Sequence, residues 1–378
     1  MSLERFKTEC LFLLVGTNPL PNYVASLLLA MEGGKVILLH SRGTGKIAEN
    51  IKLAVENRKI PVEIQLWEID ETDGERIARK LEKDVFPSLN APTSIGLNYT
   101  GGTKSMAVHS YRALERFVYE REIPAVFSYL DARTLSMFFN TSESPSTKRV
   151  PVREKLKIMI EELLALHGYR VVSIKREPLF PVQAIRLTTI FHQGIRSREQ
   201  LEGEFLAAFD KGYKSIEEVA CGEGEDKVTI NNWLEKNHWL EHYVLWAIKE
   251  IEGRVGIHDC ACEIKPASIS TTVIKRNPRE EDFEADVVAM RGYQLYLISC
   301  TTHSKKKDCK MKLFEAYIRA SQMGGDEAKA GLVCCSDDPL LVQQEIEEDW
   351  LTEGRVRVFG REDLPNLKEK LRDWFEST

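Results

Sequence analysis

Hydrophobic and polar positions repeat along residues 10–140 in an alternating strand–helix order. Apolar runs of strand length occur at 10–16, 35–40, 62–69, 93–99, 125–130 and 135–139. Between these runs, segments such as 45–57 carry apolar residues at a spacing near 3.6, which is typical of helices packed on a sheet. The pattern predicts an α/β fold with a parallel-rich sheet, whose ligand site lies beyond the carboxyl ends of the strands.

The pattern changes after residue 140. Residues 141–150, TSESPSTKRV, are polar and contain a proline, so we take this segment as a domain boundary. The chain then reads as helical and charged up to about residue 225. We therefore expect a first domain over 1–145, a helical connecting region over 146–225 and a second α/β domain over 226–378. In that last part, a tryptophan-rich helix precedes a strand, a hairpin with a turn at Arg291-Gly292, another helix and a further strand.

Composition narrows the class of protein. The 378 residues are 43% hydrophobic and 29% charged, as in an ordinary globular protein, and the formal net charge is −6. No run of 18 apolar residues and no signal-peptide pattern occur, so we expect a cytoplasmic protein without a membrane partner. The eight cysteines do not form the CxxC pairs of a zinc site, which favours buried reduced thiols.

One turn carries candidate binding chemistry. In NYTGGTKSM (98–106), two glycines allow the backbone to approach a ligand, and the following helix presents unpaired N–H groups at its positive end. Thr100, Thr103 and Ser105 add hydroxyl groups and Lys104 adds a positive charge, so the turn suits a phosphate. The alternative is a capped βα turn that binds no ligand, in which the glycines are needed only for the backbone geometry.

Two common nucleotide motifs are excluded. The segment SRGTGK (41–46) does not complete GxxxxGK[ST], because His40 and Ile47 stand where glycine and Ser or Thr are required. No GxGxxG follows the first strand, so a dinucleotide cofactor is not supported. These absences weigh against an ATPase or a dehydrogenase.

Three strand ends together resemble a known family. A first strand ending in VGTNPLPN, a second ending in HSRGTGK and a fourth running into NYTGGTKSMAVHSY are similar to the CARF sensor domains of type III CRISPR systems. The resemblance implies a Rossmann-like domain that pairs into a homodimer and binds a cyclic oligoadenylate, here cyclic tetra-adenylate, across the two-fold axis. It implies that the ring is bound by Thr17, Asn18, Ser41, Thr44, Thr100, Gly101, Gly102, Thr103 and Lys104.

The C-terminal half resembles the PD-(D/E)xK nucleases that are fused to CARF domains, the Can/Card nuclease group. HWLEHYV (238–244) is similar to the family's first helix and FEADVVA (283–289) to the strand with the central aspartate. The resemblance implies a restriction-endonuclease-like fold in which Glu241 and Asp286 hold Mg²⁺ or Mn²⁺. The family's E-x-K positions are occupied by Ser299 and Thr301, and a serine hydroxyl is a weak ligand for these ions.

Two interpretations of the lysine-rich helix that follows stay open. Lys312 and Glu315 are three residues apart on one helix face and could replace the missing lysine and glutamate. Alternatively, the lysines at 305, 306, 307, 310 and 312 form a solvated or phosphate-steering face. His238, His242 and His303 are expected to be surface or core histidines.

These features lead to two hypotheses of different classes. The first is a metal-dependent nuclease that cleaves DNA, RNA or both once cyclic tetra-adenylate has bound the CARF dimer. The second is a sensor that responds to the same ligand and keeps the nuclease fold without its chemistry. A third function, cleavage of the ring by the sensor domain, would need positioning of a ribose 2′-hydroxyl more than a distinctive catalytic residue.

Overall fold

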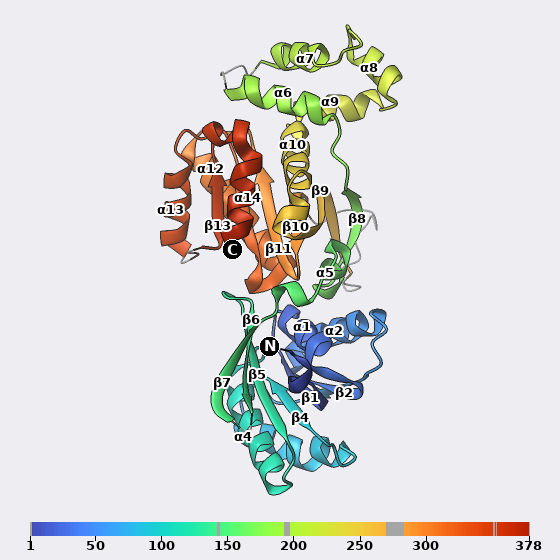
Figure 1. Cartoon of the computed structure of the whole chain (residues 1–378), viewed down its shortest axis with the longest axis vertical. Helices are drawn as coiled ribbons and strands as arrows, with labels where there is room; N and C mark the ends of the chain where they lie inside the picture. Colours follow the sequence, from blue (N-terminus) through green and yellow to red (C-terminus); the bar gives the residue numbers. More distant parts are fainter. Residues whose placement is uncertain are drawn as a thin grey trace. The chain divides into compact units, whose positions relative to one another are not determined.

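The computed structural model describes residues 2–141, 144–192, 197–269, 283–350, 352 and 354–377. Residues 142 and 143 of the polar segment 141–150 lie outside this description. The chain divides into two compact units, one of residues 1–170 with 324–327 and one of residues 171–323 with 328–378. Each unit contains its own sheet (Figure 1). The division at residues 145 and 225 stays a prediction.

The first unit contains a seven-stranded sheet in the order β3-β2-β1-β4-β5-β6-β7. Strands β1 to β5 are parallel to their neighbours, and β6 and β7 add an antiparallel edge. This is the parallel-rich sheet that the hydrophobic pattern predicts. The strands are β1 Thr8–Val15, β2 Ala30–His40, β3 Glu63–Glu68, β4 Ile95–Asn98, β5 Ala125–Asp131, β6 Ser136–Thr141 and β7 Ser144–Pro151.

Helices connect the parallel strands as expected of βαβ units. Helices α1 and α2 pack near β1, β2 and β3, whereas α3 and α4 pack against each other. Phe12 and Leu14 of β1 lie in one apolar cluster with Ile77 of α3 and Met106 of α4, so alternate residues of this buried strand face those two helices. The helices are α1 Leu20–Leu29, α2 Gly45–Asn57, α3 Gly74–Lys80, α4 Lys104–Glu120 and α5 Ile160–Leu166.

Strand β7 lies within the polar segment that we took as a boundary. It pairs antiparallel with β6 through backbone hydrogen bonds, for example at Val150 opposite Met137. An edge strand of this kind needs no apolar run on both faces, so its hydrophobic pattern is weak. The polar composition of residues 144–150 was therefore compatible with a strand.

The second unit contains a six-stranded sheet in the order β13-β12-β11-β10-β9-β8. Strands β9, β10 and β11 are antiparallel, and β11, β12 and β13 are parallel. The strands are β8 Tyr169–Lys175, β9 Ile257–Ser268, β10 Ala285–Arg291, β11 Gln294–Cys300, β12 Lys329–Val333 and β13 Val356–Phe359. Strand β8 lies in the region that the sequence predicts as helical, so that expectation was wrong for residues 169–175.

Nine helices accompany this sheet among the described residues. Helices α6 to α8 precede the nuclease-like segment, which begins with α9. Helix α10 follows directly after Asn237, whose positive φ of 62° breaks the helix between α9 and α10. The helices are α6 Pro181–His192, α7 Arg198–Ala207, α8 Ile216–Glu223, α9 Lys227–Glu235, α10 His238–Lys249, α11 Glu252–Val255, α12 Lys306–Gly324, α13 Pro339–Trp350 and α14 Leu367–Ser377.

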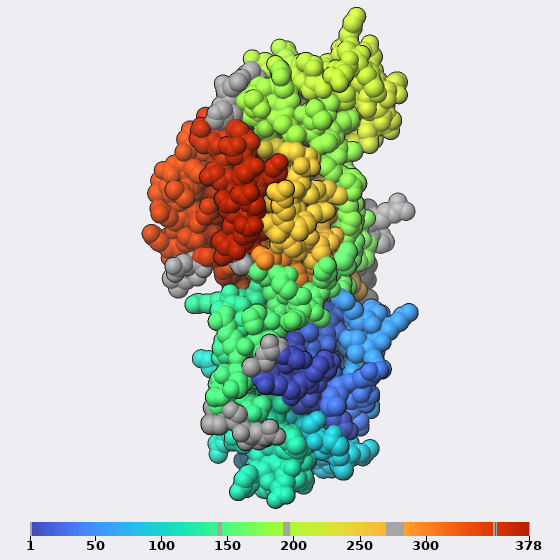
Figure 2. Space-filling view, viewed as in Figure 1, coloured from blue at the N-terminus to red at the C-terminus, as the bar shows by residue number. Residues whose placement is uncertain are grey.

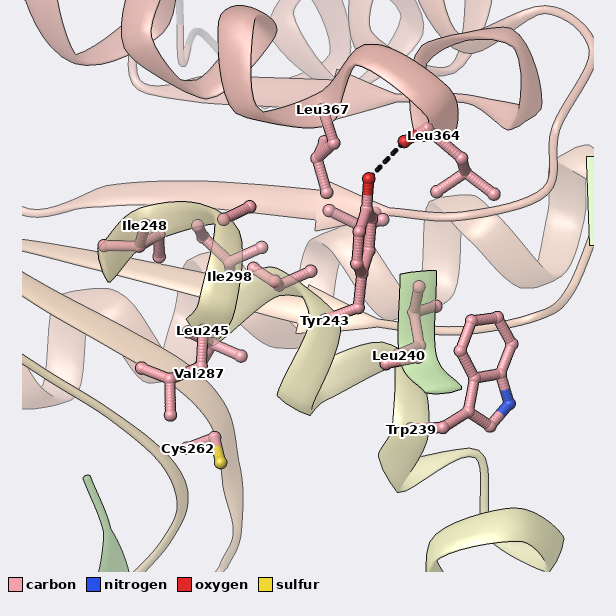
Figure 3. Close-up of a cluster of buried hydrophobic side chains, with 14 of the residues drawn as sticks. Trp239, Leu240, Tyr243, Leu245, Ile248, Cys262, Val287, Ile298, Leu364 and Leu367 are labelled. Atoms are coloured by element: carbon pink, nitrogen blue, oxygen red, sulfur yellow. Dashed lines mark hydrogen bonds between the residues drawn. The ribbon is translucent and has the colours of Figure 1, made fainter. Parts of the chain in front are cut away.

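Helix α10 is the centre of the second core. Tyr243 and Leu245 pack in one apolar cluster with Val287 of β10 and Ile298 of β11, as Figure 3 shows. The buried Tyr243 hydroxyl donates a hydrogen bond of 2.5 Å to the carbonyl oxygen of Leu364. Helix α14 contacts α10, and Figure 2 shows the C-terminal residues beside it on the surface. This packing fixes α10, which carries one of the candidate catalytic residues.

Two expectations from composition can be compared with the structure. All eight cysteines are free thiols, and of these only Cys221 is exposed. Among the residues that the structure describes, none of the helices has the length and apolar character needed to span a membrane.

Candidate ligand turn and candidate active site

The turn 99–103 joins β4 to α4 at the carboxyl edge of the first sheet. Thr103 caps α4, because its hydroxyl accepts a hydrogen bond of 3.1 Å from the N–H of Met106. Gly102 has a φ of +76°, in the left-handed region that favours glycine. The βα turn and the helix beginning at Lys104 are therefore present as the sequence predicts.

The glycines of this turn lie against the end of β1. A Cβ on Gly101 would come within 2.3 Å of the Leu14 carbonyl oxygen, and a Cβ on Gly16 within 3.0 Å of the Gly102 nitrogen. Gly16 and Gly101 are thus required for backbone-to-backbone packing, and Gly102 for its left-handed φ. The sequence left open that these glycines are needed only for the geometry of the turn. The structure shows that they are needed for that geometry, whether or not a ligand also binds.

The hydroxyl groups of the turn are engaged within the protein. Thr100 donates a hydrogen bond of 2.7 Å to Asn98 Oδ1 and accepts one of 2.7 Å from the N–H of Leu130. Thr103 and Ser105 donate to the backbone carbonyls of Glu71 (2.6 Å) and Thr72 (2.8 Å). These bonds attach the acidic loop 70–74 to the turn. Lys104 is exposed and carries the positive charge of the turn.

The other predicted ligand residues lie at the same edge of the sheet. Thr17 and Asn18 follow β1, and Ser41 and Thr44 follow β2; both strands are neighbours in the sheet that β4 also joins. Asn18 Oδ1 accepts from the N–H of Leu20 at 3.1 Å, and the Ser41 N–H donates to Thr44 Oγ1 at 3.0 Å. The fold therefore gathers the predicted residues at one edge, while their ligand contacts stay a prediction.

Glu241, in the first turn of α10, is the most unusual acid of the second unit. Its side chain is buried, and its Oε2 atom has no hydrogen-bond partner in the described part of the chain. Burial raises the pKa of Glu241 well above its usual value, and the negative charges of Asp286, Glu263 and Glu284 raise it further. A buried carboxylate among other acids is an expected site for a cation.

Asp286 lies at the start of β10 and is held by β11. Its Oδ2 atom accepts a hydrogen bond of 2.8 Å from the Ser299 hydroxyl and one of 2.7 Å from the Cys300 N–H. Burial raises the pKa of Asp286, and these two bonds oppose that rise. Ser299 therefore orients the central aspartate and does not need to act as a ligand itself.

Thr301 has a different place in the structure. Its N–H donates to the Val333 carbonyl oxygen at 2.9 Å, and its hydroxyl accepts a hydrogen bond of 3.3 Å from the His303 N–H. The hydroxyl thus closes the turn after β11. It offers no positive charge at the position where the resemblance implies a lysine.

The structure brings Lys312 of α12 into electrostatic range of the site. Its positive charge lowers the pKa of Asp286, against the larger effect of burial. Glu315 is 59% exposed and lies 3.9 Å from Lys312. Lys306 and Lys310 pair with Glu345 of α13 on the protein surface. Both interpretations of the lysine-rich helix therefore retain support. Lys312 acts on Asp286, whereas Glu315 is mostly exposed.

Glu263 of β9 belongs to the site and was missed in the sequence. Its Oε1 atom lies 2.7 Å from Lys175 Nζ, 2.9 Å from His242 Nε2 and 3.5 Å from His238 Nδ1. Burial raises the pKa of Glu263, but the bonds to His238, His242 and Lys175 outweigh it and hold that pKa well below the usual range. The only signal in the sequence is one acid inside the mostly apolar run DCACEIKP.

The proton on His242 is placed by its partners. Its Nδ1 atom accepts a hydrogen bond of 3.0 Å from the backbone N–H of Leu179, so the ring proton is on Nε2 and points to Glu263. The ring is completely buried, and burial lowers its pKa. His242 is therefore a neutral core histidine, as the sequence analysis expects, and it also positions Glu263.

The backbone of Glu263 is strained. Its φ is +48°, in the left-handed region, which costs a residue with a side chain about 1–2 kcal/mol. Strained backbone of this kind is concentrated at functional sites. The strain therefore points to a role for the Glu263 side chain beyond its place in β9.

The acids of the site suit a divalent cation. His238, Glu263 and Glu284 offer ligand atoms within 4.8 Å of one another, and His238 Nδ1 lies 3.8 Å from Glu241 Oε1. Among the described residues, the groups of ligand atoms that lie this close include neither Glu241 nor Asp286, so the structure does not bring these two predicted ligands into one such group. Two of the three donors of the His238 group are carboxylates, whose oxygens Mg²⁺ and Mn²⁺ prefer. The residues present therefore fit such an ion.

The fold and site define a two-unit protein with a Rossmann-like unit and an endonuclease-like unit. Residues 231–378 match the family model of the Card1-like endonuclease domain. The C-terminal part of the chain thus matches the Card1-like endonuclease domain, in agreement with the predicted resemblance to the Can/Card group. Among curated protein sequences, no match to the chain was found.

Solved structures show the same fold over nearly the whole chain. The protein VC1899 from Vibrio cholerae is 14% identical, with a TM-score of 0.69, covering 97% of this chain and 98% of that one. Can2 from Sulfobacillus thermosulfidooxidans, solved in complex with cyclic tetra-adenylate, is 17% identical, with a TM-score of 0.64 and coverages of 99% and 98%. The predicted mixed α/β fold, with a parallel-rich first sheet and an endonuclease-like second domain, is confirmed.

A third structure is similar over part of its own length. It is a type III CRISPR defence DNA nuclease activated by cyclic oligoadenylate, 16% identical, with a TM-score of 0.51. The match covers 87% of this chain and 45% of that one. At these identities the similarity concerns the fold.

Proposed function

We propose that this protein is a metal-dependent nuclease of type III CRISPR defence that is activated when cyclic tetra-adenylate binds a CARF homodimer. The observation that carries the proposal is the pair Glu241 and Asp286. Glu241 is buried and Asp286 is half-buried. They come from separate elements of the segment that matches the Card1-like endonuclease domain, and the negative charge of Asp286 raises the pKa of Glu241. A buried carboxylate oxygen without a partner, as Glu241 Oε2 is among the described residues, is costly and is retained where a cation or a reaction needs it.

The chemistry follows from this arrangement. Glu241 and Asp286 would hold the ion, which, when bound, stabilises charge on a phosphodiester and lowers the pKa of a bound water. Ser299 and the Cys300 N–H keep Asp286 Oδ2 in place for this purpose. Lys312 adds positive charge near Asp286.

Activation would begin at the carboxyl edge of the first sheet. The exposed Lys104, at the positive end of α4, suits a phosphate of the ring, and Thr17, Asn18, Ser41 and Thr44 lie along the same edge. A symmetric ring matches a symmetric dimer, because each protomer then supplies half of the contacts. The ring can activate the nuclease only if it binds the active arrangement more tightly than the resting one.

A specific observation favours the alternative, a sensor without nuclease activity. The Ser299 and Thr301 hydroxyls, at the positions where an acid and a lysine are implied, both serve structural hydrogen bonds. In that case, the protein would bind the same ligand and would act through nucleic acid or a partner protein.

One experiment separates the two functions. The full-length protein is incubated with Mn²⁺ or Mg²⁺ and with labelled single-stranded RNA or plasmid DNA, in the presence or absence of cyclic tetra-adenylate. Ligand-dependent cleavage that is lost in Asp286→Ala and retained in Asp349→Ala, a change at an exposed acid of α13, supports the nuclease. Tight ligand binding without cleavage of either substrate supports the sensor.

A further inference from the structure

The gap in the nuclease signature lies on β11. Ser299 and Thr301 provide neither the acid nor the lysine that the resemblance implies. We propose that Glu263 on β9 and Lys175 on β8 supply them from the opposite side of β10. This inference rests on the proposed nuclease function and names the residues that complete its site.

The sheet register places Glu263 where it can replace the missing acid. Strand β10 lies between β9 and β11. The pairs Val287↔Ile298 and Val287↔Cys262 place Asp286 directly opposite Ser299 on one side and Glu263 on the other. The backbone of Glu263 is therefore the neighbour of the central aspartate on one side of β10, as the backbone of Ser299 is on the other.

Lys175 provides the cation beside that acid. Strand β8 is the neighbour of β9 at the edge of the sheet, and Lys175 Nζ lies 2.7 Å from Glu263 Oε1. The positive charge of Lys175 also acts on Glu241, so it reaches the centre of the site. An acid and a lysine thus stand together, and the charges of both act on Glu241.

The side chain of Glu263 is held in a defined direction. His242 donates its Nε2 proton to Glu263, and the backbone N–H of Leu179 fixes the tautomer of that ring. The left-handed φ of +48° at Glu263 sets the direction of the side chain at its base. A carboxylate that is fixed by a strained backbone, a buried histidine and a lysine is preorganised for a ligand.

This pair is less exposed and closer together than the one on α12. Lys312 and Glu315 are 43% and 59% exposed and 3.9 Å apart, whereas Lys175 and Glu263 are 38% and 12% exposed and 2.7 Å apart. Exposed ion pairs are only loosely held. We assign Glu263 as an ion ligand in the group that it forms with His238 and Glu284, beside Glu241, and Lys175 as the positive charge that stabilises the phosphodiester.

The first test measures ion binding without nucleic acid. Isothermal titration of full-length protein with Mn²⁺ is compared for the wild type, Glu263→Gln, Lys175→Met and Glu315→Gln. Glu263→Gln should weaken Mn²⁺ binding by about tenfold or more. Lys175→Met should keep or strengthen it, because a nearby positive charge is removed. Wild-type affinity in Glu263→Gln, with a tenfold loss in Glu315→Gln, would overturn the assignment.

The second test measures cleavage in the presence of Mn²⁺ and cyclic tetra-adenylate. Lys175→Met should lower the rate by about 100-fold while Mn²⁺ affinity is retained. The matched control is Lys249→Met. This lysine of α10 pairs with Glu177 at 2.6 Å and not with an acid of the candidate site. Equal rates for Lys175→Met and Lys249→Met would show that Lys175 has no such role. Thermal melts that match the wild type verify that each variant is folded, since the ligand site lies in the other unit.

The outcomes separate this inference from the proposed function. If the wild type cleaves and both Glu263→Gln and Lys175→Met cleave equally well, the inference is wrong and the nuclease stands. If no substrate is cleaved but Mn²⁺ binding depends on Glu263, the ligand role of Glu263 stands and the nuclease proposal fails.

Discussion

The ligand turn of the first unit and the acidic site of the second unit differ in how their polar groups are satisfied. In the turn, the Thr100 and Thr103 hydroxyls are bonded within the protein. In the acidic site, Glu241 Oε2 is buried without a partner in the described residues, and Glu263 sits on a strained backbone. The turn is therefore stable as it stands, whereas the acidic site carries an energetic cost that a bound ion would relieve.

The difference also concerns distance along the chain. The turn is formed by consecutive residues and one neighbouring strand end. The acidic site combines Lys175, Glu241, Glu263 and Asp286, from four separate elements of the second unit. A local motif can be found in a sequence by its spacing, whereas a dispersed site becomes visible only when the register of the strands is known. Four changes test this comparison.

The largest effect is expected for Asp286→Asn. The amide keeps the size of the side chain but loses the negative charge, so nuclease activity should fall at least about 10³-fold, equivalent to about 4 kcal/mol. Binding of cyclic tetra-adenylate by titration calorimetry should stay unchanged, since the change lies in the other unit. A loss of ligand affinity in this variant would contradict the separation of the two sites.

The next effect concerns the packing of the turn. Gly101→Ala places a Cβ within 2.3 Å of the Leu14 carbonyl oxygen, so the backbone must shift and the free energy of unfolding should fall by about 2–3 kcal/mol. Gly203→Ala is the matched control, because no atom lies within 4 Å of its Cβ position in α7, and it should stabilise by about 0.5–1 kcal/mol. Urea denaturation measures both; equal stability of the two variants would contradict the tight packing.

A smaller effect is expected for Lys104→Met. Loss of one exposed charge at the start of α4 should weaken cyclic tetra-adenylate binding by about tenfold, equivalent to about 1.4 kcal/mol. The affinity should also become less dependent on salt concentration. Lys52→Met, at an exposed position of α2 beside Glu56, serves as the control and should bind the ligand normally. Equal affinities would remove Lys104 from the ligand site.

The smallest effect is a pH-dependent gain in stability from Glu241→Gln. The pKa of Glu241 is raised in the folded protein, first by burial, so the folded state keeps a proton that the unfolded chain loses above pH 4.5. The stability of the metal-free wild type must then decrease as pH rises through the folded pKa, and glutamine removes this loss. At pH 8 the variant should unfold about 2–4 °C higher, corresponding to about 1 kcal/mol, with a smaller difference at pH 5.

Added Mn²⁺ should reverse the order of stability. The wild type gains the free energy of ion binding, whereas the variant has lost a ligand. Thermal melts at pH 5 and pH 8, with and without Mn²⁺, measure all four combinations. A variant that is less stable than the wild type in metal-free buffer at pH 8 would show that Glu241 has a structural partner.

Much of the fold follows from local pattern. Gly45–Asn57 is a helix with the bounds that its periodicity predicts, and the hairpin at Arg291-Gly292 joins β10 to β11. Runs such as 10–16 and 35–40 are strands because they are buried on both faces, which requires continuous apolar residues. Strands β7 and β8 were missed because each lies at an edge of its sheet, where polar residues are tolerated.

The sequence was sufficient for the α/β class and the Thr-Gly-Gly-Thr-Lys turn, since each of these depends on short-range spacing. It also singled out Glu241 and Asp286 by a family resemblance, and their roles stay a prediction. It could not show that Gly101 packs on Leu14, that Ser299 bonds to Asp286, or that Lys175 meets Glu263 88 residues away. Those contacts depend on strand order and register, which are set by the burial of whole apolar faces. The composition of the candidate site is thus a consequence of tertiary packing.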